Sequence, residues 1–327
     1  MIIIKEKNLK IQILRAIAII AVVMIHTCPT GELQVYIRPF INFAVALFLF
    51  LSGYLTNIDT SDWKTFYKKR IVRVLIPYII WTFLYTTVHF IGNGIDFKKY
   101  IINLLSARAA ATLYYIFVYI QFVILTPLLV KLAKSKYKYI GFIIAPISVI
   151  IKYYWLFSGV EPNKYLSAIW SVCCLGWFTY YYIGLLLGNK IIKKEFNIKY
   201  LILLYLLSII IQILEGYAWF KLGETNCGTQ IKLSSFLTSS IFILIAYWYL
   251  NNKQLTQTSK MLVKIGDYSF GIYISHIMIM ILLGKIPIYT KIPFCLNSII
   301  VLLITTLCVS IGNTICGKKI SRWLGLY

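Results

Sequence analysis

Residues 9–28 read LKIQILRAIAIIAVVMIHTC, an apolar run of the length that a helix needs to cross a bilayer. Beyond Lys10 at its start, the basic side chains of Arg15 and His26 interrupt it. Such groups are costly in hydrocarbon, so they usually face the protein interior or a water-filled cavity and serve a function there. They are eleven positions apart, close to three helical turns. Both side chains are therefore expected on one face of the helix, roughly 16 Å apart along its axis.

Further apolar runs of similar length follow along the chain. With the first, ten runs lie near residues 9–28, 39–57, 71–91, 112–131, 139–157, 170–188, 199–220, 233–250, 268–285 and 294–316. The chain is 60% hydrophobic and only 13% charged, which separates it from soluble domains. We predict an all-α polytopic membrane protein, a single domain over residues 1–327, in which about ten transmembrane helices surround a central cavity.

The net charge of +23 would indicate a nucleic-acid partner in a soluble protein. Here the Lys and Arg residues gather between the apolar runs, and one set of alternate loops carries roughly twice as many as the other. Membrane topology explains this bias, so we expect no nucleic-acid partner. The positive-inside rule places both termini in the cytoplasm.

A second group of cations precedes the third run, where residues 66–78 read FYKKRIVRVLIPY. Arg70 and Arg73 are three positions apart, so their guanidinium groups share a helix face. We place both in the first turn of the third helix, where the helix dipole also favours anions. Together with Lys69, they form a predicted phosphate site. The alternative is an ordinary positive-inside cluster that binds anionic lipid headgroups.

A third feature is the segment FLFLSGYL at residues 48–55. The small residues Ser52 and Gly53 allow a ligand or another helix to approach the backbone closely. Tyr54 follows directly. The segment is therefore a candidate binding site, with plain helix packing as the alternative.

Two further ionisable side chains fall inside predicted spans. Glu215 lies towards the outer end of the seventh run and could pair with His26, or face the outer headgroups instead. His276 ends the segment IGDYSFGIYISH, residues 265–276, in which Asp267 and Ser269 are expected to cap a helix. The alternative for His276 is a core histidine, and Arg15 and His26 could likewise lie at the membrane interfaces.

Five segments in this order resemble the acyltransferase 3 family of bacterial membrane acyltransferases, over nearly the whole chain. They are residues 14–26, with an R-x10-H spacing, and residues 48–55, 66–78, 114–129 and 266–276. Residues 214–217 also resemble the membrane half of vancomycin-resistance serine racemases, a branch of the same family. The resemblance implies a ten-helix core in the bacterial cytoplasmic membrane. Its members transfer an acyl group, usually acetyl, from cytoplasmic acyl-CoA to a hydroxyl of a cell-surface glycan or its lipid-linked precursor.

These expectations assign roles to the candidate residues. The residues expected to take part in catalysis are His26, Arg15 and Glu215. Those expected to bind acyl-CoA are Arg70, Arg73, Lys69, Ser52, Tyr54 and His276. His26 is expected to act as general base on the acceptor hydroxyl, because the ordinary pKa of imidazole lies near neutral pH. An acetyl-His26 intermediate is the alternative. The pantetheine arm of the donor would run past Arg15 towards His26. No metal is expected.

Two other classes of function stay open at this point. A glycan or amino-acid transporter or flippase would also need many helices and intramembrane charge. A membrane sensor or scaffold would use Arg15 and His26 only for stability. The acceptor, the choice between acetyl and other acyl groups, and the oligomeric state are not readable from the sequence.

Overall fold

The structure is a computed structural model that describes residues 2–59, 62–91, 94, 96–159, 163–252 and 260–327. Within these residues every regular element is a helix and none is a strand, so the all-α prediction is confirmed. The chain divides into two compact units, and each of them is described by itself.

Eight helical segments of the described chain are long and apolar enough to cross a membrane. They are Leu9–Thr27, Leu33–Tyr54, Trp63–Phe90, Tyr114–Lys134, Ile169–Gly188, Ile198–Lys221, Leu233–Asn252 and Phe294–Ile315. Helices α12 (Lys260–Asp267) and α13 (Ser269–Leu283) together supply a ninth candidate, and the shorter apolar helix α7 (Ile144–Phe157) occupies the fifth run. Each predicted run thus coincides with a helical segment, which confirms a polytopic membrane protein. The central cavity and the orientation of the termini stay predictions.

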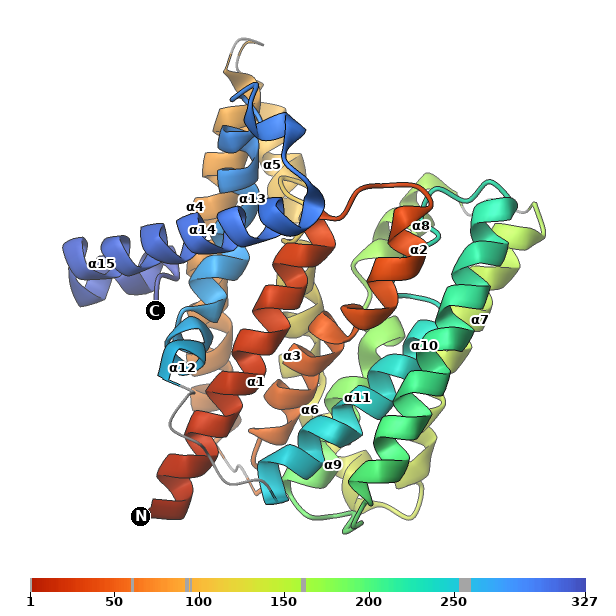
Figure 1. Cartoon of the computed structure of the whole chain (residues 1–327). Helices are drawn as coiled ribbons and strands as arrows, with labels where there is room; N and C mark the ends of the chain where they lie inside the picture. Colours follow the sequence, from red (N-terminus) through yellow and green to blue (C-terminus); the bar gives the residue numbers. More distant parts are fainter. Residues whose placement is uncertain (1, 60–61, 92–93, 95, 160–162, 253–259) are drawn as a thin grey trace. The chain divides into compact units, whose positions relative to one another are not determined.

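The first unit comprises Met1–Ile58, Leu128–Val160 and Leu175–Asp267. Besides α7 and α12 it holds α1 (Ile2–Thr27), α2 (Leu33–Ile37), α3 (Phe43–Tyr54), α9 (Phe178–Gly188), α10 (Ile198–Lys221), α11 (Leu233–Asn252) and the 3-10 turns η1 (Arg38–Phe40), η2 (Lys138–Phe142) and η3 (Leu175–Trp177). Helix α1 packs along α12, and α10 packs along α11 (Figure 1). The tightest helix pair of this unit is α3 with α9.

Glycines make the contact between α3 and α9 possible. A Cβ at Gly184 of α9 would collide with the main-chain oxygen of Phe50, and one at Gly188 with that of Tyr54. On the opposing helix, a Cβ at Gly53 would collide with the oxygen of Tyr181. Small residues of this kind let two membrane helices approach to backbone contact, where close packing drives association.

The second unit comprises Asp59–Pro127, Glu161–Cys174 and Tyr268–Tyr327. Besides α13 it holds α4 (Trp63–Phe90), α5 (Phe97–Ser106), most of α6 (Tyr114–Lys134), α8 (Lys164–Ser171), α14 (Phe294–Ile315) and α15 (Gly317–Leu324). Aromatic side chains of α4 donate hydrogen bonds to distant main-chain oxygens: Tyr85 to Ile274 at 2.9 Å, and Trp81 to Leu324 at 2.9 Å. These bonds fix α13 and α15 against α4.

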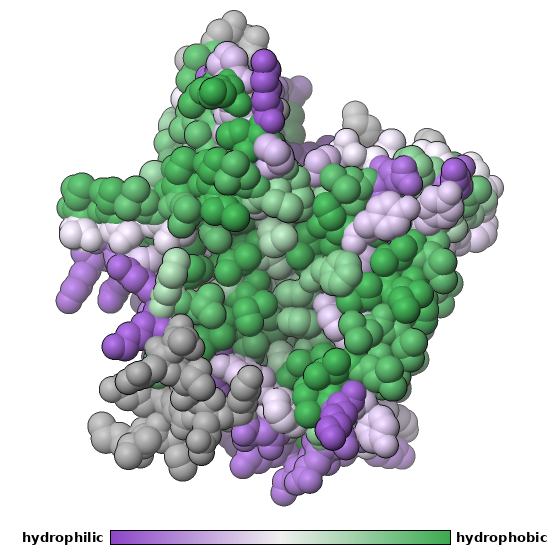
Figure 2. Space-filling model, in the orientation of Figure 1, coloured by the Kyte–Doolittle hydropathy of each residue, from purple (hydrophilic) through white to green (hydrophobic). Residues whose placement is uncertain are grey.

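The outer surface of α10 is apolar, as expected of a helix that faces lipid. Its exposed leucines and isoleucines are Ile202, Leu203, Leu204, Leu206, Leu207, Ile210, Ile211 and Leu214. Figure 2 shows apolar side chains covering this helix, which Figure 1 labels. A soluble helix would place charged residues here, so the unit is built to lie in hydrocarbon.

The glycine contact yields a direct test. We expect Gly184→Ala to destabilise the protein by about 1–3 kcal/mol, because the added methyl group overpacks the contact with α3. Intrinsic helix propensity alone would favour Ala by about 1 kcal/mol, so the two effects differ in sign. The measurement is the thermal unfolding midpoint of the purified protein in detergent.

The matched control is Gly176→Ala. A Cβ at Gly176 would make only ordinary contacts, 3.8 Å from Ser148 Oγ and 3.9 Å from Ile231 Cγ2. Equal midpoints for the two variants would contradict the packing role of Gly184.

Candidate functional site

Arg15 and His26 lie on one continuous helix. Helix α1 runs without a break from Ile2 to Thr27, so the spacing argument applies and the two residues are separated by a rise of roughly 16 Å. Both side chains are half-buried. One helix therefore presents a cation near its middle and an imidazole at its last turn.

Arg15 has polar partners inside the first unit. Its Nη1 donates a hydrogen bond to Gln12 Oε1 at 3.4 Å, and the carboxylate of Asp267 on α12 interacts with it electrostatically. The two helices approach closely because a side chain is absent at Gly266, where a Cβ would collide with the Gln12 main chain. Arg15 therefore has an acidic neighbour on a second helix of the same unit.

The predicted capping role of Asp267 and Ser269 is wrong. The N-cap of α13 is Tyr268, which makes no side-chain capping bond. Asp267 is instead the last residue of α12, and Ser269 is already the first of α13. A capping residue has an extended backbone and lies just before the first turn of its helix. Here only Tyr268 separates the end of α12 from the start of α13, so neither Asp267 nor Ser269 has that position.

Arg38 is a residue that the sequence analysis did not single out. Its guanidinium group hydrogen-bonds to the Cys28 thiol, two positions beyond His26. Burial raises the pKa of Cys28, and Arg38 only partly opposes this effect. A nucleophilic cysteine needs a lowered pKa, so the geometry does not favour Cys28 as the acyl acceptor. An arginine held beside the end of α1 is, however, suited to bind a developing negative charge.

Amide side chains fix this region to the connection between α10 and α11. Gln34 Nε2 donates to the Thr225 oxygen at 2.8 Å, and the Gly228 N–H donates to Gln34 Oε1 at 3.1 Å. Asn42 Nδ2 donates to the Gly228 oxygen at 3.2 Å. These bonds tie α2 and the start of α3 to the connection between α10 and α11.

Glu215 lies in a polar cluster at the end of α10. Its carboxylate accepts hydrogen bonds from the Tyr153 hydroxyl, from the Ser234 hydroxyl and from the Ser234 N–H, the last at 3.1 Å. Lys232 is only 1% exposed, and its ammonium group donates to the Cys227 oxygen at 2.7 Å. Tyr153 and Lys232 were not predicted as partners. A half-buried carboxylate held in this way orders the connection between the two helices.

A basic groove of about 700 Å³ lies in the second unit, between α4 and the C-terminal segment. It is lined by Lys68, Lys69, Val72, Arg73, Ile76, Arg322, Trp323 and Tyr327. Arg73 Nε donates to the Tyr327 hydroxyl at 2.7 Å, and its guanidinium carbon lies 4.5 Å from the centre of that ring. We call these eight residues the basic groove. Four cations and two aromatic rings in one concave surface suit a ligand with phosphates and a planar base.

The predicted phosphate site is placed differently in two respects. Helix α4 begins at Trp63, with the Asp62 side chain accepting from the Thr65 N–H. Arg70 and Arg73 therefore do not lie in the first turn, and the helix dipole, which acts only over that turn, does not help them. Arg70 lies over the ring of Phe66, at 4.8 Å, and is not among the groove residues.

Ser52 and Tyr54 lie at the end of α3, where it contacts α9. The Ser52 hydroxyl donates to the Phe48 oxygen at 2.9 Å, and Tyr54 packs edge-on against the ring of Tyr247 at 6.4 Å. With the Gly53 contact to α9, these interactions account for the segment by helix packing. A ligand role for Ser52 and Tyr54 stays a prediction.

His276 is fully buried in the second unit. Its Nδ1 lies 2.9 Å from the main-chain oxygen of Ile272, one turn earlier in α13, and its ring lies 6.4 Å from that of Tyr273. The Tyr273 hydroxyl donates in turn to the Thr112 oxygen. In the part of the chain that the structure describes, no group of three or more His, Cys, Asp and Glu side chains could hold a metal ion.

The buried Lys232 gives a pH prediction. Burial lowers its pKa to about 8, with Glu215 and Cys227 partly opposing this effect and Lys152 adding to it. An unfolded chain holds its lysine protons up to about pH 10.4. Between these values the unfolded state binds more protons than the folded state, so the free energy of unfolding rises with pH.

We therefore expect the wild type to gain stability relative to Lys232→Met between pH 7.5 and 9.5, as measured by thermal unfolding in detergent. Lys285→Met, which changes an exposed lysine, is the control and should track the wild type. If the difference in stability between the wild type and Lys232→Met stayed constant across this pH range, titration of the buried ammonium group would not be the cause of any pH dependence.

Comparison with known proteins bears on what these sites do. The family model described as an acyltransferase domain, that of the acyltransferase 3 family, matches residues 8–313, nearly the whole chain. Comparisons with curated proteins and with solved structures gave no match. The matched region contains α1 from residue 8 onward, the Glu215 cluster and His276, together with most of the described helices. The chain belongs to the acyltransferase 3 family and is a membrane acyltransferase.

Proposed function

We propose that this acyltransferase moves an acetyl or other short acyl group from cytoplasmic acyl-CoA to a hydroxyl of a cell-surface glycan or its lipid-linked precursor. The bacterial cytoplasmic membrane is the proposed location, with both termini in the cytoplasm. The observation that carries the proposal is the basic groove, because a phosphate-rich donor is what distinguishes an acyl-CoA enzyme from a glycan exporter.

The groove matches the chemistry of coenzyme A. The nucleotide end of coenzyme A carries a diphosphate, a further phosphate and an adenine ring. Lys69 and Arg73, predicted from the sequence, would bind the phosphates together with Lys68 and Arg322. The groove volume of about 700 Å³ lies within the range of roughly 300–1,000 Å³ typical of small-molecule sites. Trp323 and Tyr327 offer flat faces for the adenine.

His26 is the proposed general base. It accepts the proton of the acceptor hydroxyl while the oxygen attacks the thioester carbonyl carbon. As the tetrahedral intermediate collapses, the carbon–sulfur bond breaks and the sulfur takes the proton from the imidazolium, which returns His26 to its neutral form. An acetyl-His26 intermediate would divide the same net transfer into two steps.

The remaining candidates have supporting roles in this proposal. Arg15, which interacts electrostatically with Asp267, is a cation on the face of α1 that carries His26. Glu215 acts as a positioning residue, because its bonds to Tyr153 and Ser234 order the connection at the end of α10. Ser52, Tyr54 and His276 remain proposed donor contacts.

The function is tested with the purified full-length protein in liposomes, supplied with acetyl-CoA labelled in the acetyl group. Transfer of label to a glycan or lipid-linked saccharide acceptor, with release of free CoA, supports the proposal. Passage of an intact saccharide across the liposome membrane without consumption of the thioester would favour a transporter and refute the proposal.

His26→Ala is expected to lower transfer by about 10²–10⁴-fold, the contribution typical of a general base. Acetyl-CoA binding should persist, since the groove lies on other residues. His89→Ala is the matched control, because His89 is an exposed histidine at the end of α4. Full activity of the His26 variant at normal abundance would remove this residue from the mechanism.

Neutralising the groove should weaken donor binding. We expect Arg73→Gln and Arg322→Gln each to raise the Kd for CoA by about 10- to 100-fold, as lost charge-assisted hydrogen bonds predict. Added salt should weaken binding by the wild type more than by the variants. Calorimetric titration with CoA gives these values. The control Lys199→Gln removes an exposed lysine outside the groove. If it raised the Kd for CoA as much as Arg73→Gln does, the groove would not be the binding site.

A further inference from the structure

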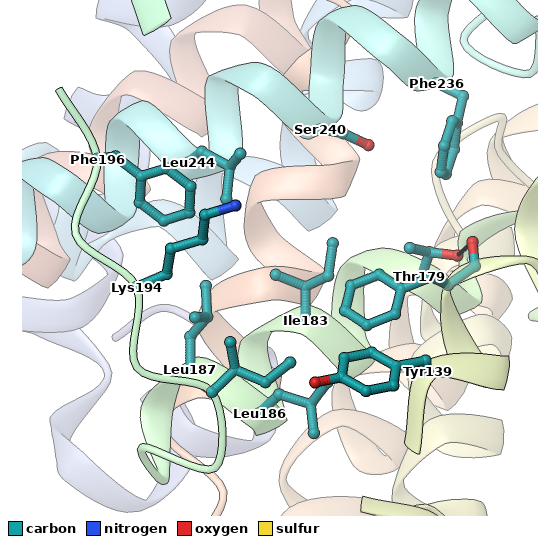
Figure 3. Close-up of a pocket in the computed structure, with 12 residues that line it drawn as sticks. Tyr139, Thr179, Ile183, Leu186, Leu187, Lys194, Phe196, Phe236, Ser240 and Leu244 are labelled. Atoms are coloured by element: carbon teal, nitrogen blue, oxygen red, sulfur yellow. Dashed lines mark hydrogen bonds between the residues drawn. The ribbon is translucent and has the colours of Figure 1, made fainter. Parts of the chain in front are cut away.

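The first unit contains a second pocket, which the proposed reaction does not use. Its volume is about 540 Å³, and it lies between α9 and α11, with η2 and the segment that follows α9 also lining it. The lining residues are Tyr139, Phe142, Thr179, Ile183, Leu186, Leu187, Ile192, Lys194, Phe196, Phe236, Ser240 and Leu244. Figure 3 shows most of these side chains converging on one space. We call it the apolar pocket.

The apolar pocket is elongated. Thr179 to Leu187 on α9 and Phe236 to Leu244 on α11 each comprise nine residues, and the eight steps between the first and the last make about 12 Å of helix. In Figure 3, Thr179 and Phe236 lie at one end, and Leu187 and Leu244 lie at the other. The aliphatic and aromatic walls between them suit a hydrocarbon chain rather than a sugar or a nucleotide.

Two polar groups interrupt these walls. The ammonium group of Lys194 points into the pocket beside Leu244 (Figure 3), and its ring partner is Phe196, at 5.7 Å. The Ser240 hydroxyl oxygen is buried and has no hydrogen-bond partner among the described residues. No acidic side chain is among the residues that line the pocket. A cation at one end and an unused donor halfway along define a polarity for the ligand.

We propose that the apolar pocket binds one acyl chain of an anionic glycerophospholipid. The headgroup phosphate pairs with Lys194, an ester carbonyl oxygen accepts from the Ser240 hydroxyl, and the chain extends past Ile183 towards Phe236. The order of cation, hydroxyl and apolar walls along the pocket matches the order of phosphate, ester and hydrocarbon along the lipid. This site is independent of the donor groove and of His26.

The charge of the pocket decides between lipid classes. A zwitterionic headgroup carries a cation of its own and gains less from Lys194 than an anionic one does. A juxtamembrane lysine contributes about a five-fold preference for anionic lipid. A soluble phosphate lacks the chain that would fill the apolar walls, so it should bind weakly.

The test uses the delipidated full-length protein in detergent, titrated with dioleoylphosphatidylglycerol or dioleoylphosphatidylcholine and followed by native mass spectrometry. We expect one tightly bound phosphatidylglycerol, and a Kd about five-fold higher for Lys194→Gln. Lys193→Gln is the matched control, because Lys193 is an exposed neighbour that does not line the pocket. Ser240→Phe should occlude the pocket and abolish tight binding of the lipid.

Three results would overturn the proposal. These are equal affinity for the two lipids in the wild type, equal effects of the Lys194 and Lys193 substitutions, and displacement of the lipid by millimolar glycerol 3-phosphate. If Ser240→Phe does not purify as a folded protein, Leu244→Phe tests the same occlusion from the other end of the pocket. Unchanged tight binding in a folded occluded variant would also refute the site.

Discussion

A polar group that enters hydrocarbon must find its partner within the protein, and this constraint governs where chemistry can lie in this chain. Hydroxyl side chains meet it locally. Ser52 donates to the oxygen of Phe48, and Thr305 to that of Val301, each one turn back in its own helix. Ionised side chains cannot be satisfied so simply and need a second element. Arg15 has Asp267 from α12, and Glu215 has hydroxyl groups from α7 and α11. Charged side chains within the membrane therefore occur where tertiary packing brings an oppositely charged or hydrogen-bonding group from another helix.

The same constraint explains why the helices of the first unit pack so closely. Lipid chains are as apolar as leucine, so burial of apolar surface does little to bring membrane helices together. Contact between backbones replaces that driving force, and it requires positions without side chains. Gly53 and Gly184 on the α3–α9 pair and Gly266 on α12 are such positions. The contact at Gly266 also brings Asp267 to Arg15, so a packing device determines the electrostatics of the helix that carries His26.

Much of the fold was readable from residue order. The ten apolar runs coincide with helical segments, and the eleven-residue spacing from Arg15 to His26 lies on unbroken helix. The errors share one cause: apolar runs locate the hydrocarbon-spanning part of a helix but not its ends. Helix α4 begins at Trp63, ahead of its apolar run. The positive end of the helix dipole therefore lies at the turn that starts at Trp63 and not beside Arg70 and Arg73. Asp62, which caps that helix, was the local signal for its true start.

The sequence by itself determined the all-α membrane class, the helical segments and the residues of unusual chemistry, because each depends on neighbours within a few turns of one helix. Family membership follows from the same linear pattern. Tertiary structure alone decided which of these residues share a surface. Arg73 meets Tyr327 and Arg322 in one groove, although about three-quarters of the chain separates them, while its near neighbour Arg70 turns to Phe66. The reason is physical: a binding surface forms from elements distant along the chain, and only their packing determines which side chains it contains.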